Sequence, residues 1–267
     1  MKLWMLGSGS SGNAVLCECG DQRILIDCGF GTRTLARRMA VAGVHPASIS
    51  ACLVTHEHSD HISGVVKAAA KWAWPIFASV GTAVSSELAE APVTTISAAE
   101  PLELDRMYIE VVPTPHDAAE SVGYVITSRA TGARAAIFYD IGHVSNTIRS
   151  ACTDADILII ESNHDDEMLR WGPYPRWLQE RIRGSTGHLS NRHAAELIGE
   201  SVHDRLQHVV LAHLSEQCNT PRKALDSVSP TLRKTRFRGR LTAAPQDRVV
   251  GPFVPRFGAG QLELGLG

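Results

Sequence analysis

His56-Glu57-His58-Ser59-Asp60-His61 is the stretch that decides the fold of this chain. It holds three histidines and one aspartate within six residues, directly after the apolar run at 51–54. Imidazole nitrogens suit zinc and similar transition metals, and carboxylate oxygens suit harder ions such as manganese. Because the apolar run indicates a buried strand, we expect these side chains to gather at the end of that strand around a metal ion that activates water.

The composition is that of an ordinary globular protein. The 267 residues are 44% hydrophobic, which is enough for a sizeable core. The formal net charge of −2 excludes a global attraction to nucleic acid, although a local basic patch can still provide one. The six cysteines form no CxxC pair and are expected to be reduced thiols in the core. The apolar run at the N-terminus is too short for a signal peptide, and no run of about 18 apolar residues exists, so we expect a cytoplasmic protein with no membrane partner.

Strand and helix patterns alternate along the whole chain. Short apolar runs between glycine-rich turns predict strands at 3–6, 14–19, 23–27, 51–54, 76–78, within 93–139, and at 157–160, 209–212 and 238–243. Longer amphipathic stretches predict helices at 31–42, 62–74, 80–90, 190–202 and 220–228.

No linker divides this pattern into two cores. We therefore expect a single α/β domain over residues 1–250, built as a layered sandwich with helices outside two packed sheets. A C-terminal tail would follow over 251–267, with a frayed glycine-rich end at 258–267.

The loop Gly7-Ser8-Gly9-Ser10-Ser11-Gly12 matches G-x-G-x-x-G after a predicted strand. A dinucleotide site needs a helix next, because the helix N-terminus holds the pyrophosphate. A strand pattern follows instead, so no nucleotide cofactor is expected. Two interpretations stay open: a plain hairpin turn, or a loop whose backbone N–H groups help to hold an anionic substrate. In the second case Ser10 and Asn13 would contact that substrate.

Three further ligand-type residues each follow an apolar run. His116 comes after 111–115, Asp140 after 136–139 and His213 after 209–212. Layered α/β folds place their chemistry at the ends of strands. One such histidine alone would more often be structural, but four separate segments with the same pattern indicate a centre with seven ligands and two metal ions.

The HEHSDH motif, preceded by Ile24-Leu25-Ile26-Asp27-Cys28-Gly29, resembles the metallo-β-lactamase superfamily over roughly residues 1–245. The resemblance implies a four-layer αββα sandwich. It also implies a role for each ligand-type residue: His56, His58 and His116 on metal one, Asp60, His61 and His213 on metal two, and Asp140 bridging them. Asp27 would brace the histidine loop without binding metal.

Two further motifs narrow the resemblance. The units Gly187-His188-Leu189-Ser190-Asn191 and Ala212-His213-Leu214-Ser215 resemble the phosphodiesterase branch, which implies a ligand role for His213 and a catalytic, non-ligand role for His188. The glycine loop and the segments 161–165 and 172–175 resemble YycJ/WalJ-type bacterial exonucleases, which act on double-stranded DNA from the 5′ end. Substrate contacts by His143, His164 and Asn191 are expected on this basis, with surface roles for the two histidines equally open.

Basic residues interleaved with aromatics crowd residues 170–183, and a second basic stretch spans 221–248. Arginine and aromatic planes hold phosphates and stack bases, although a solvated face has the same composition.

Only 72 residues separate Asp140 from His213. The large inserted domain of RNA-processing relatives does not fit there, which favours DNA over RNA.

These features together predict a dinuclear-metal phosphodiesterase, specifically a 5′ to 3′ exonuclease of double-stranded DNA. A hydroxide bridging two zinc or manganese ions, with iron as a third option, would attack phosphorus. Asp60 would orient this nucleophile, and His188 would donate to the phosphate or the leaving oxygen. Two alternatives remain: hydrolysis of a small phosphodiester such as a cyclic nucleotide, and a non-catalytic metal-binding regulator. The sequence also leaves the oligomeric state open.

Overall fold

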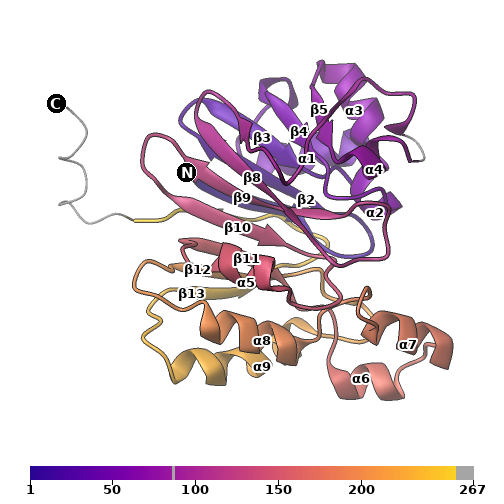
Figure 1. Cartoon of the computed structure of the whole chain (residues 1–267), viewed down its shortest axis with the longest axis vertical. Helices are drawn as coiled ribbons and strands as arrows, with labels where there is room; N and C mark the ends of the chain where they lie inside the picture. The colour runs from indigo at the N-terminus through magenta and orange to yellow at the C-terminus, as the bar shows by residue number, and fades with distance from the viewer. Residues whose placement is uncertain (86–87, 257–267) are drawn as a thin grey trace.

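A computed structural model of the chain describes residues 1–85 and 88–256. Two seven-stranded sheets pack face to face, and helices cover the outer face of each sheet (Figure 1). The four layers confirm the predicted αββα sandwich. Within the described residues, no helix is both long enough and apolar enough to cross a membrane.

The first sheet has the strand order β14-β1-β2-β3-β4-β5-β6. Its strands are β1 (Lys2–Gly7), β2 (Ala14–Cys19), β3 (Gln22–Ile26), β4 (Ala51–Leu53), β5 (Ile76–Ala78), β6 (Val93–Thr95) and β14 (Val250–Phe253). The first three strands form an antiparallel meander, and β3 to β6 are parallel. Helices α1 (Thr32–Val41) and α3 (Val65–Trp72) connect the parallel strands and lie on the outer face (Figure 1).

The second sheet has the order β13-β12-β11-β10-β9-β8-β7. Its strands are β7 (Leu102–Glu103), β8 (Met107–Pro113), β9 (Val122–Ser128), β10 (Arg134–Phe138), β11 (Ile157–Glu161), β12 (His208–Ala212) and β13 (Arg240–Ala243). The last four of these strands are parallel. Helices α5 (Asn146–Cys152), α8 (Asn191–Glu200) and α9 (Pro221–Arg233) cover the outer face of this sheet (Figure 1).

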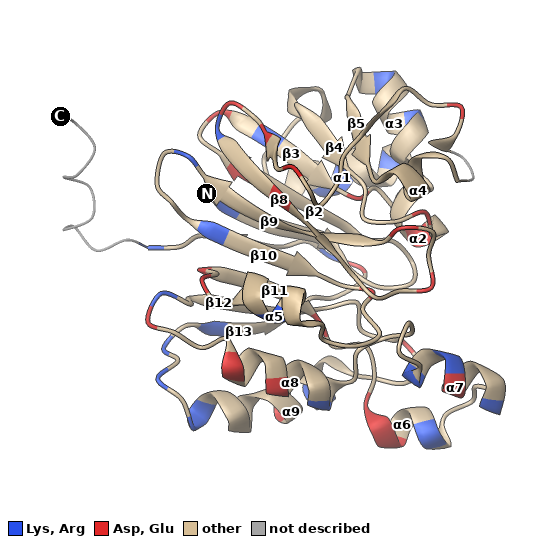
Figure 2. Ribbon diagram, viewed as in Figure 1, with Lys and Arg blue, Asp and Glu red and all other residues tan. Residues whose placement is uncertain are grey.

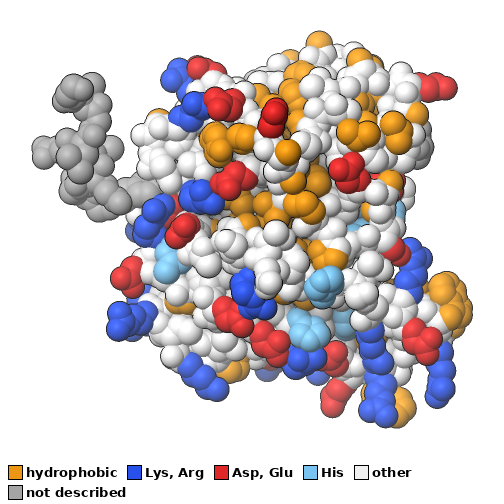
Figure 3. Space-filling view, viewed as in Figure 1, with side chains coloured by type: hydrophobic (Ala, Val, Ile, Leu, Met, Phe, Trp, Pro, Cys, Tyr) orange, Lys and Arg blue, Asp and Glu red, His pale blue; other side chains and the backbone are white. Residues whose placement is uncertain are grey.

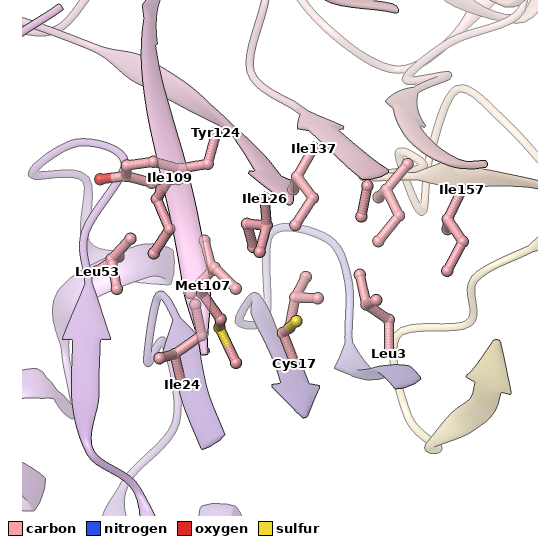
Figure 4. Packing of buried hydrophobic residues seen from close by; sticks show 14 of the residues in the cluster. Leu3, Cys17, Ile24, Leu53, Met107, Ile109, Tyr124, Ile126, Ile137 and Ile157 are labelled. Atoms are coloured by element: carbon pink, nitrogen blue, oxygen red, sulfur yellow. The ribbon is translucent and has the colours of Figure 1, made fainter. Parts of the chain in front are cut away.

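The main core lies between the two sheets. Successive strand residues point to opposite sides, so Ile24 and Ile26 of β3 pack toward the second sheet, and Leu25 packs beneath the helices. In Figure 4, Leu3 of β1 faces Ile157 of β11 across this interior. Because both faces are covered at the centre of each sheet, central strands such as β2, β4 and β11 are buried along their whole length. All six cysteines are buried and unpaired, as predicted.

Four boundaries differ from the sequence predictions. The helix predicted at 62–74 is two helices, α2 (Ser59–Ile62) and α3, separated at Gly64, whose Cα lies against the Phe30 carbonyl and leaves no room for a side chain. The helix predicted at 80–90 is shorter and forms only α4 (Val80–Ala83). β-Branched residues disfavour a longer helix, and the Ser85 hydroxyl donates to the Thr82 carbonyl, which competes with helical hydrogen bonds. Helix α9 continues past 228 to Arg233 because Leu232 is buried.

The fourth difference concerns the end of the domain. β14 pairs with β1 in antiparallel fashion, with Phe253 opposite Leu3. Residues 251–253 therefore belong to the sheet and not to the tail in which the sequence placed them. The predicted frayed end at 258–267 lies outside the described residues.

Three helices between β10 and α8 were missed: α5, α6 (Asp166–Trp171) and α7 (Arg176–Arg183). α6 and α7 are short and largely exposed. α7 is amphipathic, but the sequence reasoning treated residues 170–183 only as basic residues interleaved with aromatics and so overlooked the helical spacing of Leu178 and Ile182.

Candidate metal centre

The ligand-type side chains converge at one edge of the sandwich, where parallel strands of both sheets end. His56 follows β4 of the first sheet, and Asp140 and His213 follow β10 and β12 of the second sheet. Asp140 and His213 have φ values of 54° and 52°, in the left-handed region that residues other than glycine seldom occupy. Such strain persists only where the surrounding contacts impose it, and it is frequent at functional sites.

All seven predicted ligands lie in overlapping groups, in each of which the potential ligand atoms are within 4.8 Å of one another. The groups are His56 with His58 and His116; His56 with His61 and Asp140; Asp60 with His61 and His213; and Asp140 with Glu161, His188 and His213. The first and third groups are the two sets that the sequence assigned to separate ions, and Asp140 lies in groups that connect them.

The donor set fits divalent metal ions. His56 Nε2 is buried and has no hydrogen-bond partner among the described residues. The facing nitrogens His116 Nε2 and His58 Nδ1 are 3.2 Å apart, and Asp140 Oδ2 is 2.9 Å from His61 Nε2 without the geometry of a hydrogen bond. Buried polar atoms that face one another without other partners are costly, and a shared cation would satisfy them.

The protonation of the cluster also fits a site for divalent metal ions. Burial lowers the pKa of His56 well below its usual value, and the neighbouring His61 lowers it further, so this imidazole is neutral. Burial alone would lower the pKa of His213, but Asp140, together with hydrogen bonds to Asp60 and Glu161, raises it to about 9. In the absence of metal, protonated imidazoles such as that of His213 therefore offset the charge of the ionised carboxylates. Divalent ions would replace these protons.

Asp27 braces the histidine loop. Its Oδ2 accepts hydrogen bonds from His61 Nδ1 at 2.7 Å, Thr55 Oγ1 at 2.8 Å and the Tyr139 hydroxyl at 2.8 Å, and its Oδ1 accepts from the Thr55 N–H. These contacts leave His61 Nε2 as the nitrogen that faces the other ligands. A carboxylate that orients a ligating imidazole in this way is a frequent feature of metal sites.

Glu161 is a central residue that the sequence reasoning missed. Its Oε1 lies 2.8 Å from His188 Nδ1 and 3.1 Å from His213 Nδ1, and its Oε2 accepts from the N–H groups of Ile141 and Leu189. The sequence signal was available, because Glu161 ends the apolar run of β11 just as the ligands end theirs. Its carboxylate connects the predicted catalytic histidine to a predicted ligand.

The glycine loop is a hairpin turn between the antiparallel strands β1 and β2. Its backbone N–H groups at Gly9, Gly12 and Asn13 bond to Asn13 Oδ1, the Gly9 carbonyl and the Asp60 carbonyl, respectively. These three donors are therefore unavailable to an anion, which supports the simpler of the two interpretations. The Ser8 hydroxyl accepts from the N–H of His213, so the loop also supports that ligand.

A cleft of about 220 Å³ opens beside the metal centre. Its lining includes Ser10, His58, His188, Tyr174 and Arg181. Ser10 and His188, two residues for which the sequence predicts a role toward substrate, both face this space. Burial alone would lower the pKa of His188, but Glu161 and Asp140 outweigh it and raise this pKa well above its usual value.

The other four predicted substrate-binding residues do not line this cleft. The Asn13 amide is buried against Asp60, 3.1 Å from its Oδ2. Asn191 exchanges hydrogen bonds with Asn219 and accepts one from Ser162, all of them buried. These two amides brace the loops, because each satisfies buried polar groups of neighbouring segments.

The two histidines of this set lie elsewhere. His143 is exposed, and its Nδ1 lies 2.8 Å from the Ser185 carbonyl, away from the cleft. His164 lies just before α6 and is buried, and burial lowers its pKa to about 4. The cleft therefore gives no support to the expected substrate contacts of Asn13, Asn191, His143 and His164, which stay predictions.

Comparison with known proteins agrees with this geometry. The family model for the beta-lactamase superfamily domain matches residues 22–213, a span that includes all seven predicted ligands and His188. The chain is 32% identical over 238 residues to exodeoxyribonuclease YycJ of Bacillus anthracis, covering 87% of this chain and 89% of that protein. It is also 32% identical over 225 residues to exodeoxyribonuclease WalJ of Streptococcus pneumoniae, covering 82% and 83%.

A solved structure shares the fold. The metallo-β-lactamase fold protein YhfI from Bacillus subtilis matches with a TM-score of 0.69 and 18% identity, covering 94% of this chain and 99% of that chain. Identity at this level shows a common fold only, whereas the family model and the 32% identity to the curated relatives show the family. The chain belongs to the metallo-β-lactamase superfamily and, within it, to the YycJ/WalJ-type branch.

Proposed function

We propose that this protein is a metal-dependent phosphodiesterase that degrades double-stranded DNA from 5′ ends with two divalent ions, zinc or manganese. The observation that carries the proposal is the position of His188, on the wall of a cleft and against the gathered ligands. The relatives that cover more than four fifths of the chain are named exodeoxyribonucleases, which supports DNA as the substrate.

The ligand groups suggest which residues would hold each ion. His56, His58 and His116 would hold the first, and Asp60, His61 and His213 the second, with Asp140 between them. When bound, the ions would supply Lewis-acid activation of water and would offset negative charge on the phosphate.

Asp60 would orient the attacking water. Its Oδ2 is fixed by contacts of 3.1 Å to Asn13 Nδ2, 3.3 Å to His61 Nε2 and 3.4 Å to His213 Nε2. Burial would raise the pKa of Asp60, but its hydrogen bonds to His213 and His61 hold this pKa far below its usual value, so the carboxylate stays ionised. An ionised carboxylate held in one orientation limits the directions from which water can donate to it, which favours one geometry of attack.

His188 would serve the leaving group. Its Nδ1 is engaged by Glu161 at 2.8 Å, so Nε2 is the nitrogen available to the cleft. From there it can donate a proton to the departing oxygen or a hydrogen bond to the phosphate.

Tyr174 on the same wall offers a plane on which a base could stack. The cleft is smaller than the roughly 300–1,000 Å³ of sites that enclose a whole ligand, so it would accept one terminal nucleotide of a longer chain.

Replacing His188 with alanine tests the catalytic role. We expect turnover of linear duplex DNA to fall by about 10²–10⁴-fold, the usual contribution of a positioned general acid, with metal content unchanged. His143→Ala is the matched control, since this exposed histidine lies outside the cleft. Unchanged turnover in a fully metallated His188→Ala protein would remove the residue from the mechanism.

Labelled substrates test the reaction itself. Duplexes labelled at the 5′ or the 3′ end, with and without chelator, should release the 5′ label first and only when metal is present. Faster release of the 3′ label would contradict the polarity and leave the hydrolysis intact. Turnover of a small chromogenic phosphodiester without any DNA cleavage would favour a small-molecule substrate. Tight metal binding with no hydrolysis of either would favour a regulator.

A further inference from the structure

A second, larger cleft lies at the opposite end of the sheets from the metal centre. It has a volume of about 700 Å³ and is formed by the start of β12, the loop before β13 and the residues after β14. β12 runs from His208 at this cleft to Ala212, next to the ligand His213. Five residues at about 3.3 Å each separate the two sites by roughly 16 Å. In Figure 1 the loop between α9 and β13 is at the left, whereas α2 and α7 are at the right.

The cleft is strongly basic. Its lining includes Arg236, Arg238, Arg240 and Arg256 against a single carboxylate, Asp204. Across the described residues, none of these four arginines pairs with a carboxylate, whereas nearby Arg205 is 2.9 Å from Asp156. Figure 2 shows basic residues along this loop, and Figure 3 shows basic side chains gathered at this edge of the surface. Like charges held together without partners repel one another, which favours binding of an anion.

The walls of the cleft are held in place by hydrogen bonds. Gln207 bonds to the backbone of Arg256 in both directions, at 2.7 and 2.9 Å, and its own carbonyl accepts from the N–H of Arg240 at 2.8 Å. His208 Nε2 donates to the Val254 carbonyl at 3.1 Å. Burial and the two nearby guanidinium groups of Arg240 and Arg256 outweigh this bond and lower the pKa of His208, so the positive charge of the cleft comes from arginine. A fixed arrangement of charges binds an anion with little ordering cost.

We propose that the arginine cleft, defined by Arg236, Arg238, Arg240 and Arg256, binds backbone phosphates of the nucleic-acid substrate at a distance from the active site. The proposal rests on the proposed function and adds a second contact to it. Guanidinium groups match phosphate oxygens in bidentate geometry. Phosphates recur every 3.4 Å along each strand of a duplex, so 16 Å corresponds to about five base pairs. Only substrates longer than this would reach both sites.

Binding of DNA hairpins of two lengths tests the proposal. The stems would have about 4 and about 20 base pairs, below and above the span between the two sites, with phosphorothioate linkages to resist hydrolysis by the metallated protein. The variant R236Q/R238Q/R256Q removes three exposed guanidinium groups outside any strand. The control R37Q/K67Q/K71Q removes the same charge from exposed positions of α1 and α3.

We expect wild type and control to bind the long stem more tightly than the short one, and the arginine variant to lose that difference. The slope of log affinity against log salt for the long stem should fall by about 1 for each arginine removed. Equal affinities and slopes in all three proteins would overturn the proposal. The proposal would also be overturned if the arginine variant bound a nucleoside triphosphate less tightly than wild type but bound the long stem equally well. If binding follows the expectation but unmodified DNA is never cleaved, the arginine cleft stands and the proposed function fails.

Discussion

The metal centre depends on buried carboxylates that are not among the predicted ligands. Asp27 and Glu161 are both fully buried, and both hydrogen-bond to imidazoles of predicted ligands. A buried carboxylate persists only when its lone pairs are used. Glu161 uses them through two imidazole nitrogens and two backbone N–H groups.

Glu161→Gln is therefore expected to disrupt the site although it preserves shape. A carboxylate accepts all four of these hydrogen bonds, whereas a glutamine turns one oxygen into a donor that must face other donors. We expect metal affinity to fall by about 10–100-fold, as for the loss of other residues that orient ligands, and turnover to fall with it. Competition with a chromogenic chelator measures the affinity. Glu167→Gln, at an exposed position of α6, is the control, and equal affinities in the two variants would contradict the assigned role.

The secondary-structure elements differ in how clearly the sequence predicts them. The buried strands are recognisable because both of their faces are apolar and turns bound them, as for β11 and β12. The exposed helices α6 and α7 carry no such pattern, and the break at Gly64 arises from its contact with Phe30, more than thirty residues away in sequence. A contact between elements decides the break at Gly64, so periodicity alone does not reveal it.

Strand β2 offers a test at the scale of an element. Glu18 is nearly buried and pairs across the sheet with Lys2 of β1 at 2.8 Å and Arg23 of β3 at 2.7 Å. Burial alone would raise the pKa of Glu18, but the two basic partners lower it below its usual 4.5. A lowered pKa in the folded state means that ionised Glu18 stabilises the protein above pH 4.5, and that this stabilisation disappears as the pH falls through the folded-state pKa.

Glu18→Gln should accordingly lower the free energy of unfolding at pH 7 by on the order of 1 kcal/mol, the scale of cross-strand charge pairs. The difference from wild type should shrink in strongly acidic solution. Urea unfolding at several pH values measures it. Glu196→Gln breaks an exposed pair with Arg192 and should have a smaller effect with little pH dependence. A difference in the free energy of unfolding between wild type and Glu18→Gln that grows in acid would contradict the assigned role of Glu18.

The whole molecule is two sheets whose strand ends meet at one centre. Predicted ligands follow β4 of the first sheet and β8, β10 and β12 of the second, so bound metal would tie the sheets together. Removing metal should therefore destabilise the entire domain. At a metal concentration one hundred times Kd, each ion contributes about 2.7 kcal/mol, or roughly 5–10 °C in Tm for a chain of this size.

Thermal unfolding with and without chelator measures this contribution. The Tm should rise with metal concentration in the wild-type protein and much less in His213→Ala, which lacks one predicted ligand. An unchanged Tm after complete removal of metal would show that the centre does not hold the sheets together.

The sequence by itself determined the family, the sandwich and the seven ligand candidates. It did so because HEHSDH is contiguous and because each remaining candidate lies within three residues of the end of a recognisable strand. The tertiary structure alone decided that Asn13 and Asn191 brace loops, that Glu161 joins His188 to His213, and that three distant segments form the arginine cleft. These assignments depend on which buried polar groups pair with each other across the fold. The spacing of residues along the chain does not specify these pairs.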